Sequence, residues 1–95
     1  MNSTNFGVFK KEAVARGFDD AVVRTQPADT ATETHMHAFD VDAVVADGEM
    51  WLTCDHLTRH LLPGDVFSLP ASTPHSERYG PDGATYWVAR RKTAA

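Results

Sequence analysis

Cysteine is almost absent from the chain, because Cys54 is the single one among 95 residues. A lone cysteine excludes an intramolecular disulfide, whereas small secreted domains usually depend on several. The paired cysteines of structural zinc sites are excluded for the same reason. We therefore expect Cys54 to be a small apolar side chain in a strand, in a cytoplasmic protein.

Long hydrophobic runs are also missing. The first residues, MNSTNFGVFKKEAV, have no extended apolar stretch and include Lys10, Lys11 and Glu12. This composition argues against a signal peptide, and no segment approaches the roughly 20 apolar residues that span a bilayer. We expect no membrane contact.

The chain lacks an excess of positive charge, since its formal net charge is −4. Its one basic cluster, residues 90–92, reads Arg-Arg-Lys near the C-terminal end. Nucleic-acid binding requires a basic surface that neutralises phosphates, so we expect no nucleic-acid partner.

What the sequence does contain is the composition of one small globular domain, which we place at residues 1–95. Hydrophobic residues make up 42% and charged residues 23%. Phe6, Phe9 and Ala13 recur at roughly helical spacing, which predicts a short amphipathic helix over residues 5–17 that ends at Gly17. Its candidate N-caps are Asn2, Ser3 and Asn5.

Strand-like runs fill the rest of the chain. Residues 21–26 (AVVRTQ) are rich in β-branched side chains, and residues 27–34 form a polar loop. Further on, turn-forming residues separate the runs VDAVVA, EMWLTC, LTRHLL, VFSLP, HSERY and ATYWVAR. Many short strands with frequent turns predict an all-β antiparallel sandwich or barrel.

Two histidine-bearing stretches suggest chemistry. The first, ETHMHAFDVD at residues 33–42, places His35 and His37 one residue apart. On a strand, residues i and i+2 share a face, so both imidazoles would lie on one side. The second, PGDVFSLPASTPH at residues 63–75, ends at His75.

Together these stretches resemble the two motifs of the cupin superfamily. The first motif is a His-x-His pair followed by a carboxylate and a strand ending in glycine. In the second, Gly64, Pro70 and His75 have the family's spacing, while Ser72 stands where glycine is usual. The resemblance covers residues 27–90 and implies a double-stranded β-helix, or jelly roll. Residues 5–19 resemble the leader of small stand-alone cupins, some related to sugar-sensing regulator domains.

The resemblance also implies a metal site. His35, His37 and His75 would converge inside the barrel on a divalent transition metal, which we expect to be Zn, Ni, Fe or Mn. The usual fourth ligand, a glutamate, is replaced by Val41. Asp40 and Asp42 flank that position, but strict strand alternation points both away from the site.

A bulge would turn one of these aspartates inward. We favour Asp40 as the fourth ligand, followed by Asp42, with a water molecule as the third alternative. Glu77 shares a strand face with His75 and is our candidate catalytic residue, acting as a further ligand or as a general base. It could instead pair with an arginine or accept a hydrogen bond from Tyr79.

Other aromatic and histidine residues are expected outside the metal site. We place His56 in an exposed hairpin turn and leave the orientation of His60 open. Core positions are expected for Trp51, Phe67, Tyr86 and Trp87.

Three functions stay open at this stage. A metal-dependent enzyme would carry out dioxygenase- or isomerase-like chemistry on a small molecule. A binding or sensor module would hold a small, sugar-like ligand without chemistry. The metal could also serve only to stabilise the small barrel. Edge strands that need covering suggest a homodimer.

Overall fold

The structure is a computed structural model that describes residues 5–92. One helix precedes five strands along the chain. The elements are α1 (Phe6–Ala15), β1 (Asp20–Gln26), β2 (Phe39–Cys54), β3 (Leu57–Leu61), β4 (Val66–Leu69) and β5 (His75–Lys92). Within the described residues, no helix is long and apolar enough to cross a membrane.

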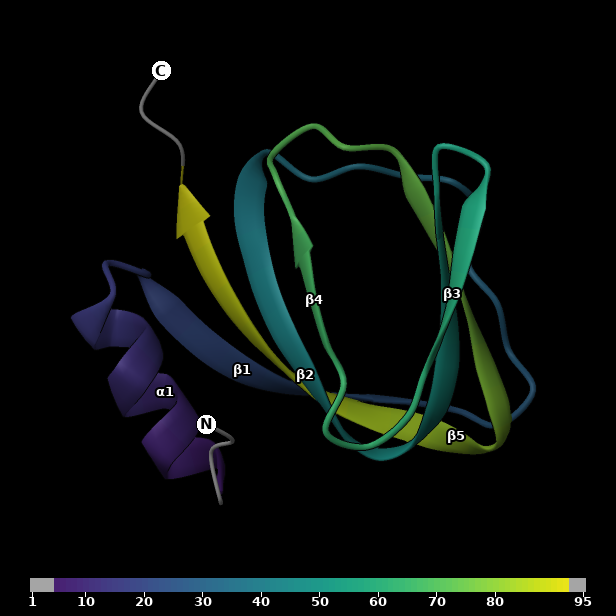
Figure 1. Cartoon of the computed structure of the whole chain (residues 1–95), viewed down its shortest axis with the longest axis horizontal. Coiled ribbons are helices and arrows are strands. Elements are labelled where there is room, and N and C mark those ends of the chain that lie inside the picture. The colour runs from purple at the N-terminus through teal and green to yellow at the C-terminus, as the bar shows by residue number, and fades with distance from the viewer. Residues whose placement is uncertain (1–4, 93–95) are drawn as a thin grey trace.

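The strands form one curved antiparallel sheet in the order β1-β5-β2-β3, and β4 pairs with β2. β2 and β5 bend sharply, so that β3 and β4 lie on opposite sides of a rolled sheet (Figure 1). The helix packs outside this roll, next to β1 (Figure 1). This is the predicted all-β jelly roll with a short N-terminal helix.

Helix α1 begins and ends where the sequence indicates. The Asn5 side chain caps it by accepting a hydrogen bond from the Val8 amide at 2.9 Å. Gly17 has a φ of 99°, a left-handed conformation that terminates helices and suits glycine. The predicted range of 5–17 is therefore right to within two residues.

The expectation that turns separate residues 41–46 from 49–54, and 75–79 from 84–90, is wrong. Both pairs of runs belong to single long strands, β2 and β5, which bend at shifts in their mutual register. Gly48, with a φ of 74°, lies at the bend of β2. A Cβ there would stand 2.2 Å from the Gly83 carbonyl oxygen, so the two backbones approach as closely as only glycine allows.

Two apolar clusters hold the fold together. The larger lies inside the roll, where alternate residues of β2 such as Val41, Ala43 and Val45 face Phe67 and Leu69 of β4. The smaller lies between α1 and the sheet; it consists of Phe9, Ala13, Phe18, Ala21 and Ala89, with Phe6, Val44 and Trp87 packed against it. The inner cluster leaves one end of the roll for polar residues, and the histidines lie there.

Candidate metal centre

His35 and His75 are held together by their own backbones. Each donates its amide N–H to the carbonyl of the other, both at 2.9 Å, as an isolated antiparallel bridge. This bridge joins the segment before β2 to the first residue of β5. The strand expected to carry His35 and His37 is thus only an extended segment, because β2 begins at Phe39. The alternation still holds, since Met36 between them is 55% exposed.

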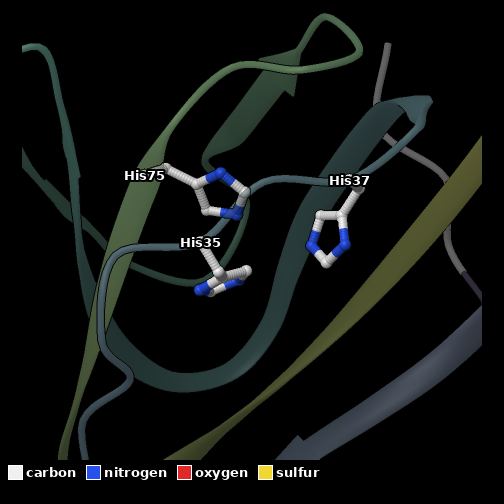
Figure 2. A group of neighbouring side chains, drawn as sticks. All are labelled: His35, His37 and His75. Carbon is white, nitrogen blue, oxygen red and sulfur yellow. The ribbon is translucent and has the colours of Figure 1, made fainter.

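The three imidazoles form one group (Figure 2). Ring centroids are 4.4 Å apart for His35 and His75, 5.0 Å for His35 and His37, and 5.3 Å for His37 and His75. One nitrogen from each ring lies within 4.8 Å of the others. Three nitrogens bonded to one ion at about 2.1 Å in tetrahedral geometry lie about 3.4 Å apart. The most distant pair of rings would therefore have to close by up to about 1.4 Å to share one ion.

Backbone carbonyls fix the tautomers of two of these rings. His35 Nδ1 lies 2.8 Å from the Glu33 carbonyl oxygen, and His75 Nδ1 lies 2.9 Å from that of Thr73. Because a carbonyl can only accept, each Nδ1 carries the proton and donates it. Nε2 is left with a free lone pair in both rings. A metal-binding histidine is usually oriented in this way, so the donor set fits a transition metal.

Burial favours the neutral form of His37. Desolvation lowers the pKa of His37, and the neighbouring His35 and His75 lower it further. The ring of His37 also stacks on Phe39, with centroids 4.9 Å apart. His75 is only 2% exposed. Neutral imidazole is the form that binds metals, so this environment keeps His37 available as a ligand near neutral pH.

Neither aspartate is brought to the histidines. Asp40 accepts hydrogen bonds from the Ala71 amide at 2.8 Å and from Arg91 at 3.0 Å. These two donors, with the Ala71 amide first, lower the pKa of Asp40. Asp42 binds Arg16 at 2.9 Å and accepts from Ser68. Val41 between the two aspartates is buried in the core, so β2 starts in strict alternation, without the bulge that would turn Asp40 inward.

Glu77 lies at the edge of the cluster. Its Oε1 is 3.9 Å from His35 Nε2 and accepts a hydrogen bond from the Tyr79 hydroxyl at 3.0 Å. Tyr79 approaches the Tyr86 hydroxyl at 3.5 Å, and Gln26 donates to Tyr86 at 3.2 Å. Glu77 is thus positioned by a chain of polar groups and lies beside a candidate ligand.

A cavity of about 210 Å³ opens in front of the histidines. Three kinds of residue line it: the histidines with Glu77, an apolar floor, and a set of polar side chains. The floor is Phe39, Val41, Phe67, Leu69, Tyr86 and Val88, and the polar set is Arg24, Gln26, Thr32 and Arg90. Most of the polar set comes from residues 21–34, which carry no motif. Arg24 and Gln26 reach the cavity because β1 pairs with β5, and Thr32 reaches it through hydrogen bonds to the Glu77 backbone.

The other two histidines lie elsewhere. His56 is exposed in the β2–β3 turn, where Asp55 and His56 both have positive φ, as a two-residue hairpin requires. His60 is exposed on the outer face of the sheet. Trp51 was expected in the core, but it stacks on His60 on that outer face instead.

Comparison with solved structures shows that the fold is that of the cupins. DMSP lyase DddQ from Ruegeria pomeroyi DSS-3 superimposes with a TM-score of 0.71 at 28% identity, over 79% of this chain and 40% of that one. KdgF from Halomonas sp. superimposes with a TM-score of 0.66 at 24% sequence identity, over 78% of this chain and 69% of KdgF. An RmlC-like cupin from Shewanella frigidimarina superimposes with a TM-score of 0.69 at 22% sequence identity, over 78% of this chain and 66% of that one.

The chain therefore has the fold of small cupins, and the solved structures that it resembles include cupins. No family model matches its sequence. A curated relative, an uncharacterized HTH-type transcriptional regulator from Haemophilus influenzae, is 47% identical over 36 residues. That match covers 38% of this chain and 12% of the regulator, so it concerns a small part of a much longer protein.

Proposed function

We propose that this cupin binds a divalent transition metal through His35, His37 and His75 and acts on a small molecule held in the adjoining cavity. The observation that carries the proposal is the convergence of three imidazole nitrogens within 4.8 Å, two of them oriented by backbone carbonyls. Zinc, nickel, iron and manganese all suit such a donor set. Asp40 is left out of the ligand set, because both its oxygens are engaged elsewhere.

Each residue of the site has a distinct task in this proposal. A bound ion would act as a Lewis acid that polarises an oxygen of the substrate or of water. Glu77 would take up and return a proton, because its Oε1 lies beside His35. Tyr79 would hold that carboxylate in place through its hydroxyl. The apolar floor would exclude bulk water from the reacting atoms.

The reaction class we favour is a dioxygenase- or isomerase-like conversion of a small oxygenated compound. One structural neighbour is named a DMSP lyase, which shows that a protein with this fold can be an enzyme. The chain spans about two fifths of that protein, so neither its substrate nor its reaction is carried over.

Metal analysis tests the proposal directly. The wild-type protein and a variant with His35, His37 and His75 all changed to alanine are purified without chelator, and bound metals are quantified by plasma mass spectrometry. We expect close to one equivalent in the wild type and almost none in the variant. A His56→Ala, His60→Ala double variant is the matched control and should keep its metal. Equal metal content in all three proteins would refute the site.

A second candidate function is a ligand-binding or sensor module without catalysis. The partial match to a transcriptional regulator favours it. Sugars and small acids would be screened by thermal shift on metal-loaded and metal-free protein. A ligand that stabilises both forms equally, and that is recovered unchanged after incubation, supports binding alone.

We also propose that the protein is a cytoplasmic homodimer. Strand β1 ends the sheet order, and Val23 on it is 48% exposed. An edge strand with exposed apolar side chains is usually covered in the native assembly. Light scattering after size exclusion would return a mass of twice 10.4 kDa if this is right.

A further inference from the structure

Arg24 is a cavity residue that the metal site does not use. On β1, Val22 packs against the inner core and Gln26 donates to the Tyr86 hydroxyl, so both face inward. Alternation along a strand then directs Arg24, midway between them, to the same side. It lies opposite Tyr86 in the β1–β5 register and lines the cavity together with the histidines.

The positive charge of Arg24 has no ion-pair partner in the part of the chain that the structure describes. The cavity holds a second arginine, Arg90, but Asp20 binds it through two hydrogen bonds of 2.7 and 3.0 Å. Among residues 5–92, Arg24 makes no such ion pair, hydrogen bond or ring contact.

The two groups define what kind of molecule fits the cavity. A guanidinium presents a planar fork of N–H donors that matches a carboxylate through two parallel hydrogen bonds. The histidine cluster offers a place for an oxygen atom of the same ligand. The cavity of about 210 Å³ that Arg24 and the histidines both line, with its largely apolar lining, leaves room for a short carbon chain.

We propose that the substrate or ligand is a small monocarboxylic acid whose carboxylate binds Arg24 and whose hydroxyl or carbonyl oxygen points at the histidine cluster. The second half of this statement rests on the proposed metal site, whereas the first half depends only on Arg24.

Binding of matched acids and amides tests the inference. Glycolate, lactate and pyruvate are compared with glycolamide, lactamide and pyruvamide, which have nearly the same shape but no charge. Each is titrated into ¹⁵N-labelled protein, metal-free and zinc-loaded, and followed by NMR. The variants are Arg24→Gln and Arg24→Lys. Arg59→Gln is the control, because Arg59 is exposed like Arg24 but does not line the cavity, and its guanidinium donates to the Val66 carbonyl.

We expect at least one acid to bind wild-type protein at least tenfold more tightly than its amide. Arg24→Gln should remove that difference, Arg24→Lys should restore part of it, and Arg59→Gln should leave it unchanged. Melting temperatures close to wild type would show that the variants are folded.

Two results would overturn the inference: acids that bind no better than their amides at concentrations up to about 50 mM, or equal acid binding by wild type and Arg24→Gln. A failure of the proposed metal site can be distinguished from a failure of the Arg24 inference. Zinc would then not bind, while the preference for acids over amides and its dependence on Arg24 would persist in the metal-free protein.

Discussion

Two faces of one short stretch of β5 show how differently the fold uses neighbouring residues. His75, Glu77 and Tyr79 alternate toward the inside of the roll, where His75 and Tyr79 are each 2% exposed. Ser76 and Arg78 lie between them and face outward. The inner residues connect the histidine cluster to a chain of hydroxyl and carboxylate groups, as described above.

The outer face carries a stack of side chains across three strands. The Arg78 guanidinium lies 3.9 Å from the centroid of the Trp51 ring, and His60 stacks on Trp51 at 4.5 Å. His60 Nε2 is paired with Glu49 at 2.7 Å. This outer histidine thus has its ring nitrogen committed to a carboxylate. Two of the inner histidines, His35 and His75, bind backbone carbonyls through Nδ1 and keep Nε2 for a ligand, so the residue type alone does not define the site.

The largest expected difference between the two faces is in metal-linked stability. At free zinc about 100-fold above its Kd, binding to the folded state adds about 2.7 kcal/mol. For a domain of this size, that raises the Tm by roughly 10–20 °C. We expect His75→Ala to abolish the increase and Arg78→Ala, three residues further along β5, to retain it. Calorimetry with zinc and then with EDTA measures both, and an equal increase in the two variants would contradict the assignment.

A smaller difference concerns the hydroxyl of Tyr79. Changing Tyr79 to Phe removes the donor to Glu77 and leaves a largely buried carboxylate without its partner. We expect the free energy of unfolding to fall by about 1–3 kcal/mol. The matched outer change is Thr58→Ala, which removes the exposed hydroxyl pair with Thr53 and should cost well under 1 kcal/mol. Urea unfolding of both variants makes the comparison, and equal losses would show that Tyr79 has no special role.

The sequence was sufficient for the fold and for the three histidines because both depend on local signals. Spacing placed His35 and His37 on one side, and the match of residues 63–75 to a motif brought in His75. Whether Asp40 or Asp42 points toward the histidines could not be predicted from such local signals. It depends on whether β2 begins with a bulge, and that is decided by pairing with β4 and by partners such as Ala71 and Arg91 far along the chain.

Arg24 is a cavity residue that could not be predicted from the sequence. Nothing near it in the chain suggests a site, and it becomes a cavity residue only through the pairing of β1 with β5. The continuous course of β2 and β5 is a similar case. Turn-forming residues such as Gly48 mark a change of direction, but whether a strand ends or bends there depends on the partner backbone across the sheet.

A pH titration of the metal-free protein sharpens the comparison further. Burial and the two neighbouring histidines lower the pKa of His37 below its ordinary value of about 6.5. The unfolded chain therefore binds more protons than the folded one as the pH falls below that value, and stability decreases with falling pH. We expect His37→Asn to lose less stability than wild type between about pH 7 and 5. Urea unfolding in EDTA checks this, and parallel curves would contradict it.

The smallest expected effect is on the outer face itself. His60→Ala removes an exposed pair with Glu49 and a stacking contact with Trp51. Exposed ion pairs contribute little because water and salt screen them, so we expect a loss of at most about 1 kcal/mol. Zinc binding should be unchanged, because the contacts of His60 are with Glu49 and Trp51 and not with the three clustered histidines. A loss of zinc affinity in His60→Ala would mean that the two faces are coupled through β2 and do not act independently.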